Sequence, residues 1–307
     1  STHQYKVTSY GATIVAITTL EVFAGIWINA FTVCVLCIGW VKKKTLNSNE
    51  KILLFLSCSR ISHLGFIWVY FFLSIIYPNH FYVHPILQLL SFFTAFFNYS
   101  NLWVSACLCV FYCKKITNFR NRFFIYLKVK IDRMVPWLLL GSMLSALTTG
   151  ILIYDLSETV QSNNLTFTSL GNIWKSDFRM DKYFFSFLLA GVGYAASFMA
   201  VIFSALFLLF SLWRHKRTMQ TNSMKDLSME AHIRAMKSIL SFLAMYTINF
   251  VCLLLTIIYN MKNENIMRLL ICIYLCAFSG VHSLILICSN PKLEKALLKM
   301  LSYVKCE

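Results

Sequence analysis

Long blocks of apolar residues are the feature that most constrains this chain. A helix needs about 20 consecutive apolar residues to cross the hydrocarbon core of a bilayer, and seven stretches of the 307-residue sequence meet or approach that length. Hydrophobic residues make up 58% of the chain and charged residues only 13%, whereas a soluble domain carries about a quarter charged residues. The sequence therefore excludes an ordinary water-soluble enzyme and predicts a protein whose solvent is mostly lipid.

The seven blocks predict an all-α membrane protein, a seven-transmembrane helix bundle with a short amphipathic C-terminal helix. We expect residues 1–290 to form the bundle and residues 291–307 to form the cytoplasmic amphipathic helix and tail, in which apolar residues recur at helical spacing between lysines. A helix of that type lies along a membrane surface. The predicted spans are residues 10–40, 52–77, 84–113, 134–154, 183–213, 238–260 and 266–289.

Basic residues fall mostly on one side of the predicted membrane. The chain holds 28 Lys and Arg against 12 Asp and Glu, a formal net charge of +16. Sorted by alternate loops, 21 bases and six acids lie on the side of the C-terminus, and six bases and five acids on the side of the N-terminus, which gives +15 and +1. Because Lys and Arg accumulate in cytoplasmic loops, we expect a multi-pass protein of the plasma membrane with an extracellular N-terminus and a cytoplasmic C-terminus. The bases then face anionic lipid, and no nucleic acid partner is expected.

Cysteine placement and a glycosylation signal agree with this orientation. None of the 11 cysteines falls in a predicted outer loop, so no extracellular disulfide is expected. Cys306, in the membrane-proximal tail, is either an unmodified thiol or a palmitoylation site. The longest predicted outer loop, residues 155–182, contains Asn164-Leu165-Thr166, an acceptor sequence for N-glycosylation. We therefore expect a glycan at Asn164.

Two ionisable residues lie in the middle of predicted spans, Glu21 in the first and Arg60 in the second. Such residues are costly in lipid and are functional-site hypotheses by default. Glu21, Gly25 and Asn29 share one helix face, where Gly25 permits a neighbouring helix to approach closely. The side-chain oxygen of Asn29 can accept a hydrogen bond from the Arg60 guanidinium. The pattern favours contacts that tie helices together over a proton relay or ion path, which needs more acids at depth.

The seventh span adds His282 and Ser283, which are also expected to tie helices together. The sequence contains no metalloprotease, nucleophile-elbow or phosphate-binding motif and no His/Cys/Asp cluster, so neither an enzyme nor a metal or cofactor is predicted. We find no internal repeats or broken helices of the kind many transporters show. A heptahelical receptor is therefore favoured. The alternatives are a heptahelical transporter or channel that uses Glu21 and Arg60, and a non-signalling scaffold or a peptide receptor.

Short motifs follow one another from the first span to the tail. They are Glu21-x3-Gly25-x3-Asn29, Gly39-Trp40-Val41, Leu56-Ser-Cys-Ser-Arg60-Ile61, Phe111-Tyr112-Cys-Lys-Lys115-Ile116-Thr-Asn118-Phe119, Ser211-Leu212-Trp213-Arg214-His215, His232-x4-Lys237, Phe242-Leu243-x2-Tyr246, His282-Ser283-Leu284-Ile285-Leu286 and Asn290-Pro291-Lys292-Leu293. This series resembles the taste receptor type 2 (bitter taste receptor) family of G-protein-coupled receptors. The resemblance implies a receptor for small bitter molecules that activates heterotrimeric G proteins of gustducin or Gi type, with βγ and phospholipase C signalling downstream.

The resemblance also implies a ligand cavity between the outer halves of the third, fifth, sixth and seventh spans. By position, Asn98 matches a pocket asparagine, and Tyr246 matches a tyrosine that links the pocket to activation. Thr94 stands where the family has a tryptophan, and Cys272 where some members have an acid, so an aromatic partner and an anchor for cationic ligands are both absent. The aromatic residues near this region either form apolar walls of the cavity or face lipid; they are Phe93, Phe97, Tyr194 and Phe198.

Two serines stand where the family often has proline, Ser197 in the fifth span and Ser279 in the seventh. Proline kinks are therefore not available, and any bend is expected to come from Gly191, Gly193, Gly280 or bound polar groups.

Activation is expected to shift the sixth span and expose an inner surface, which requires that an agonist bind the two states with different affinity. Basic residues on that surface either contact the G protein or pair with lipid phosphates; they are Lys114, Lys115, Arg214, His215, His232 and Lys237.

Overall fold

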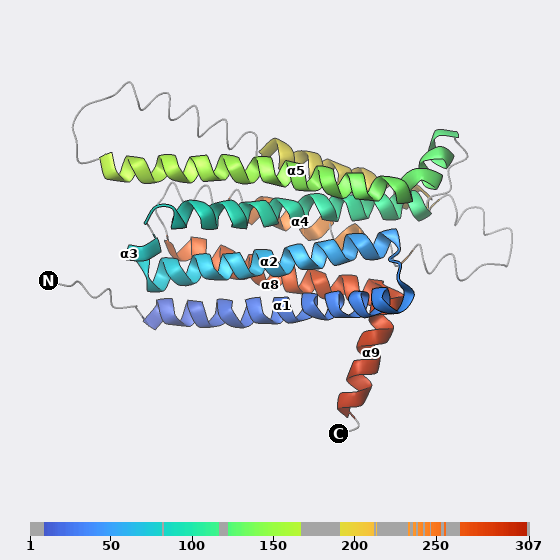
Figure 1. The fold of residues 1–307 in the computed structure, drawn as a ribbon, viewed down its shortest axis with the longest axis horizontal. Helices are drawn as coiled ribbons and strands as arrows, with labels where there is room; N and C mark the ends of the chain where they lie inside the picture. The colour runs from blue at the N-terminus through green and yellow to red at the C-terminus, as the bar shows by residue number, and fades with distance from the viewer. Residues whose placement is uncertain are drawn as a thin grey trace.

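The computed structural model describes residues 9–81, 83–116, 122–166, 191–211, 213 and 265–305, and between them residues 233, 236–237, 239–241, 243–245, 247–252 and 255. In these ranges every element of regular structure is a helix (Figure 1). Most helices run side by side as a bundle, and the last one leaves the bundle at a steep angle close to the C-terminus (Figure 1). The labelled helices are α1 (Ser9–Lys43), α2 (Ser48–Ile76), α3 (Pro78–Phe81), α4 (Ile86–Ile116), α5 (Arg122–Thr166), α8 (Asn265–Ser289) and α9 (Pro291–Lys305).

Five of the described helices are long and apolar enough to cross a membrane. They are Ala12–Lys43, Ser48–Ile76, Ile86–Cys113, Lys130–Asp155 and Gly191–Ser211, and two shorter apolar helices are Ile239–Cys252 and Ser279–Ser289. Each of the seven overlaps one of the spans expected from hydropathy. The helix Gly191–Ser211 is drawn in yellow in Figure 1.

Local chemistry explains where the loop between α1 and α2 begins and ends. Lys44 adopts a φ of 55°, and this left-handed conformation stops α1 while the Lys44 N–H still donates to the Trp40 carbonyl at 2.7 Å. The carboxylate of Glu50 accepts the Asn47 N–H at 3.1 Å, which satisfies a backbone donor at the start of α2. The end of α1 and the start of α2 are therefore joined by a short, defined connection.

The C-terminal end of α5 differs from the expectation. A loop was predicted from residue 155, but α5 continues to Thr166. Residues 155–166 contain neither Gly nor Pro, so nothing in the local sequence ends the helix where the polar residues begin. The glycosylation sequence at Asn164 consequently lies in the last turn of α5 and not in an irregular loop.

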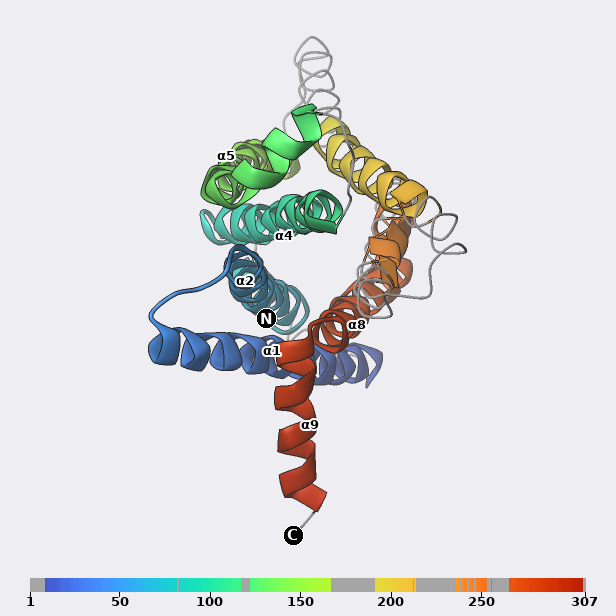
Figure 2. The same ribbon diagram turned by 90° about the vertical axis from the view of Figure 1, so that its right-hand side faces the viewer.

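Of the five long apolar helices that the structure describes, α4 is the most buried. In its most apolar window 67% of the residues are buried, compared with 17% for α5 and 28% for α1. Seen along the bundle, α2, α5 and the helix Gly191–Ser211 lie around α4 (Figure 2). A residue on any face of α4 therefore meets another helix or the interior of the bundle, and not only lipid.

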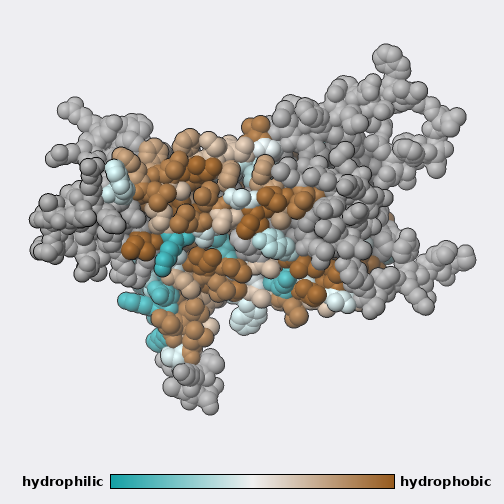
Figure 3. Space-filling view, turned by 180° about the vertical axis from the view of Figure 1, so that it is seen from behind, coloured by the Kyte–Doolittle hydropathy of each residue, from teal (hydrophilic) through white to brown (hydrophobic). Residues whose placement is uncertain are grey.

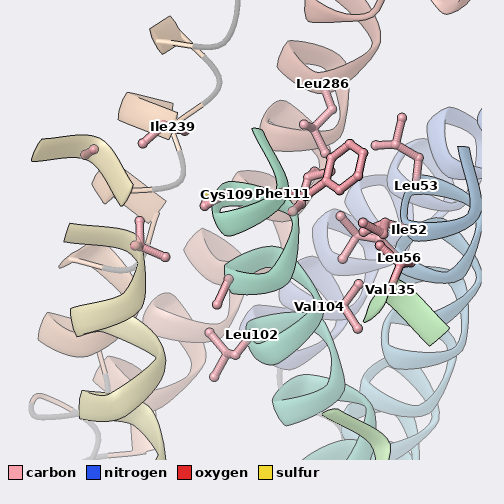
Figure 4. Packing of buried hydrophobic residues seen from close by; sticks show 14 of the residues in the cluster. Ile52, Leu53, Leu56, Leu102, Val104, Cys109, Phe111, Val135, Ile239 and Leu286 are labelled. Atoms are coloured by element: carbon pink, nitrogen blue, oxygen red, sulfur yellow. The ribbon is translucent and has the colours of Figure 1, made fainter. Parts of the chain in front are cut away.

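The core consists of close-packed aliphatic and aromatic side chains from all of these helices. Phe111 of α4, which is 1% exposed, lies between Leu53 of α2 and Leu286 of α8 (Figure 4). Because lipid is as apolar as leucine, such contacts stabilise the bundle through van der Waals packing more than through exclusion of water.

The outer surface of the bundle is apolar where it is described. Trp27, Trp137 and Leu20 are 76%, 73% and 72% exposed, and the described part of one face is mostly hydrophobic, with hydrophilic residues gathered toward the α9 end (Figure 3). Exposed apolar area on this scale is unfavourable in water. It fits helices that are surrounded by lipid.

Candidate functional site

A buried hydrogen-bond network joins α2 to α8 through Arg60. One guanidinium nitrogen, Nη1, donates to the Ser283 hydroxyl at 2.8 Å, and the other, Nη2, donates to Nδ1 of His282 at 2.6 Å. All three side chains are at least 97% buried. A guanidinium carries a rigid fork of donors, so two adjacent acceptors on one turn of α8 match it.

The network continues from α8 to α1. The Ser283 hydroxyl donates to Oδ1 of Asn29 at 3.1 Å and also lies 3.1 Å from the Ser279 carbonyl oxygen. The Asn29 amide nitrogen in turn donates to the Gly25 carbonyl at 2.8 Å. The sequence placed the Asn29 oxygen as a direct acceptor for Arg60, and the structure inserts the hydroxyl of Ser283 between them as a bridge.

Small residues bring these three helices together. A Cβ atom added to Gly25 would lie 2.8 Å from Cδ1 of Leu64 in α2, and one added to Gly280 would lie 3.8 Å from the Gly25 Cα. The predicted close approach at Gly25 is therefore confirmed. Farther along the same contact, the Trp68 indole N–H donates to the Thr19 hydroxyl at 2.9 Å.

Glu21 lies on α1 beside this junction, but the hydrogen bonds just described do not include it. Its Oε2 atom is buried and has no hydrogen-bond partner among the described residues. The five residues that we assigned to a helix network thus separate into a connected set of four and a carboxyl group that stands apart.

The predicted ligand-binding residues of α4 have three different surroundings. Phe97 stacks against Phe66 of α2, with ring centroids 5.6 Å apart and an interplanar angle of 15°. Asn98 is exposed. Thr94 is half-buried, and its Oγ1 atom has no hydrogen-bond partner in the described part of the chain.

The helix Gly191–Ser211 carries two more of the predicted ligand residues. Tyr194 is 5% exposed, and its ring centroid lies 6.0 Å from that of Phe250. Phe198 packs partly buried against the main core, so neither residue is simply lipid-facing. Ser197 is fully buried and its hydroxyl donates to the Tyr194 carbonyl at 2.8 Å, within a helix that continues to Ser211. Tyr246 and the side chain of Cys272 lie outside the described residues.

The predicted G-protein-contact residues are only partly described. Lys114 and Lys115 fall in the last turn of α4, but their side chains are not among the described ones. Lys237 is exposed. Arg214, His215 and His232 lie outside the described residues.

Sequence reasoning missed an ion pair between the start of α9 and the start of α2. Nζ of Lys292, the second residue of α9, lies 2.5 Å from Oε1 of Glu50 near the start of α2. The same lysine passes over Gly39 of α1, where an added Cβ would come within 2.5 Å of Nζ. Asn290 precedes α9, and its Oδ1 accepts the Lys292 N–H at 3.0 Å. Asparagine before Pro291 is a typical helix start, and α9 begins at Pro291, as the sequence predicted.

Within the described ranges no group of three or more His, Cys, Asp or Glu could hold a metal ion. Hydrogen bonds between side chains of α1, α2 and α8 position these helices relative to one another.

Comparison with known proteins gives a match along nearly the whole chain. The profile of one family, described as Taste receptor protein (TAS2R), matches residues 7–305. A relative from Homo sapiens, taste receptor type 2 member 9, is 33% identical over 296 residues that cover 93% of this chain and 92% of the relative. Another from Papio hamadryas, taste receptor type 2 member 10, is 31% identical over 299 residues that cover 96% of this chain and 95% of the relative.

Proposed function

The chain belongs to the taste receptor type 2 family, and from this premise we propose that it senses small bitter molecules and activates a heterotrimeric G protein of gustducin or Gi type. The predictions of an all-α seven-helix bundle and of a G-protein-coupled receptor are confirmed by this membership. The family's members are receptors rather than enzymes, and the transporter or channel alternative is not supported. The protein is a multi-pass membrane protein.

The observation that carries the proposal is the extent of the match. Residues 7–305 include every described helix, so the resemblance concerns the whole bundle and not one motif. The buried set of Arg60, His282, Ser283 and Asn29 unites three helices that are distant in sequence. A receptor needs such a rigid part against which other helices can move.

We place the agonist in the outer half of the bundle, beside α4. The central position of α4 and the exposure of Asn98 support this site. Thr94, Phe97, Tyr194, Phe198, Tyr246 and Cys272 are the other residues proposed to line it. An agonist that binds one state more tightly than another shifts the equilibrium by that difference in affinity.

We orient the receptor in the plasma membrane with its N-terminus outside and its C-terminus in the cytoplasm. The basic residues proposed to contact the G protein then lie at the inner ends of the spans, where Lys237 is exposed. Asn164, at the outer end of α5, is the proposed glycan site, and Cys306 is the candidate for lipidation. The apolar positions of α9, with Leu298 and Leu301 58% and 52% exposed, rest on the inner leaflet.

A calcium-release assay tests the proposal. Cells that express the full chain and a promiscuous G-protein α subunit are exposed to a panel of bitter compounds, and surface expression is measured in parallel. At least one compound should give a dose-dependent signal. A receptor at the surface that answers to a peptide or an ion and to no bitter compound would contradict the proposal. Tyr246→Phe should weaken the agonist response without loss of surface expression, and an unchanged dose response would remove Tyr246 from the switch.

A further inference from the structure

One face of α4 carries a row of polar side chains that the sequence analysis did not identify as a unit. Thr94, Asn98, Asn101 and Ser105 are spaced i, i+4, i+7 and i+11, so they share one side of the helix. We term this row the α4 polar face. Thr94 is half-buried and Asn98 is exposed, whereas Asn101 and Ser105, farther along the helix, are 8% and 3% exposed.

The other sides of α4 are occupied by neighbouring helices. Toward α2, Phe97 stacks on Phe66. Toward α5, the Ser100 hydroxyl lies 3.7 Å from the sulfur of Met143. Neither of these sides contains a residue of the α4 polar face.

A third side of α4 faces the helix Gly191–Ser211. A Cβ atom added to Gly193 would lie 4.0 Å from a ring carbon of Tyr99. The α4 polar face lies between the side of Tyr99 and the side of Phe97, and it therefore looks into the ring of helices seen along the bundle (Figure 2). Solvent reaches this face at Asn98 and is excluded at Asn101.

Two oxygen atoms of the α4 polar face are buried without a hydrogen-bond partner. They are Oγ1 of Thr94 and Oδ1 of Asn101. A buried oxygen without a donor costs about 1–3 kcal/mol, and such groups in native proteins point to a missing partner. Thr94 and Asn101 are two helical turns apart, which corresponds to about 10 Å along α4.

We propose that Asn101 is the inner end of the agonist site and that its Oδ1 accepts a hydrogen bond from an uncharged donor, a hydroxyl or amide N–H, on the agonist. This inference rests on the proposed function. The agonist extends along the α4 polar face from Thr94, past Asn98, to Asn101. The four residues of this face include no acid, so nothing there compensates the desolvation of an ammonium group. An uncharged donor meets the same oxygen without that cost.

The test uses bitter phenols and their O-methyl ethers as matched probes in the calcium-release assay with the full chain. A phenol donates a hydrogen bond, and its ether does not. The readout is the potency ratio of phenol to ether for each pair that activates the receptor. Asn101→Leu removes the acceptor at similar size, and Asn101→Ala serves as a second variant. Ser100→Ala is the control, because it removes a buried polar group from the adjacent position on the α5 side.

In the wild-type receptor the phenol should be about three- to tenfold more potent than its ether, the range expected for one net hydrogen bond. Asn101→Leu or Asn101→Ala should bring the ratio close to one, and Ser100→Ala should leave it unchanged. An unaltered ratio in the Asn101 variants overturns the inference.

If neither Asn101 variant reaches the cell surface, the potency ratio of phenol to ether in the wild-type receptor becomes the test. Equal potency of phenols and ethers then overturns the inference. A surface-expressed receptor that responds to bitter compounds but shows no such preference contradicts the inference alone. One that responds to no compound of the panel contradicts the proposed function as well.

Discussion

The junction of α1, α2 and α8 and the α4 polar face contain similar polar residues, but they differ in how far these side chains hydrogen-bond to other helices. At the junction, Arg60, Ser283 and Asn29 supply donors and acceptors for one another at 2.8 to 3.1 Å. On α4, Oγ1 of Thr94 and Oδ1 of Asn101 are buried without partners. Made hydrogen bonds stabilise the bundle, and unmade ones cost free energy that a ligand can recover. The comparison teaches that the hydrogen bonds that join helices and the contacts that we propose for the agonist lie in different parts of the bundle.

Replacement of Arg60 should have the largest effect on stability. Arg60→Ala removes two charge-assisted hydrogen bonds and leaves a cavity between α2 and α8, because the side chain is 1% exposed. We expect a loss of about 3 kcal/mol or more, seen as a lower midpoint of thermal unfolding in detergent and a reduced surface yield.

Arg60→Lys is the matched control, since it keeps the charge but not the fork of donors. It should recover only part of the lost stability. If Arg60→Ala keeps a normal surface yield, unfolding midpoint and signalling, the junction does not hold the helices together. The difference in stability between the junction and the α4 polar face would then disappear.

Removal of one hydroxyl from each region tests the comparison directly. Ser283→Ala leaves Nη1 of Arg60 and Oδ1 of Asn29 without the group that joins them, and should destabilise the receptor by about 2 kcal/mol. Thr94→Val removes a buried hydroxyl that has no partner and should leave the unfolding midpoint unchanged or raise it. Equal losses in the two variants, measured without agonist, would mean that the two regions do not differ.

Steric contact at the junction should have a smaller effect. Gly25→Ala places a methyl group 2.8 Å from the end of the Leu64 side chain, which must shift, at a cost of about 1 kcal/mol or more. Gly65→Ala, at the neighbouring position of α2, meets nothing within 4 Å and should be neutral or stabilising. Thermal unfolding of the two variants side by side measures the difference, and equal midpoints would show that α1 and α2 are not closely packed here.

The junction was partly predictable from the sequence because its signals are local. The spacing of Gly25 and Asn29 defines a helix face, and a buried arginine in a span demands partners. The identity of the partner was harder to predict, because Ser283 lies 223 residues from Arg60 in the sequence. Only the packing of α2 on α8 sets the register of these two residues. The sequence therefore indicated that Arg60 needs a partner, and the fold determined the bridging role of the Ser283 hydroxyl.

The end of α5 and the α4 polar face show two other features that the sequence alone did not predict. Hydropathy marks where lipid ends and not where a helix ends, so the extension of α5 to Thr166 was not predicted. The spacing of Thr94, Asn98 and Asn101 was visible in the sequence, but it did not reveal which side of α4 other helices cover. That required the contacts of Phe97, Ser100 and Tyr99.

The ion pair of Lys292 and Glu50 extends the comparison to the rim of the bundle. Breaking this pair should have the smallest effect on stability. Its side chains are 35% and 14% exposed, so solvent and salt weaken the attraction. Lys292→Met should lower stability by less than about 1 kcal/mol, and Lys295→Met, on the same helix, should change nothing. A double-mutant cycle with Glu50→Gln isolates the pair in thermal unfolding at low and high salt. A coupling that equals the effect of Ser283→Ala would mean that burial is not what separates strong polar contacts from weak ones in this receptor, whereas a small, salt-sensitive coupling leaves burial as the deciding factor.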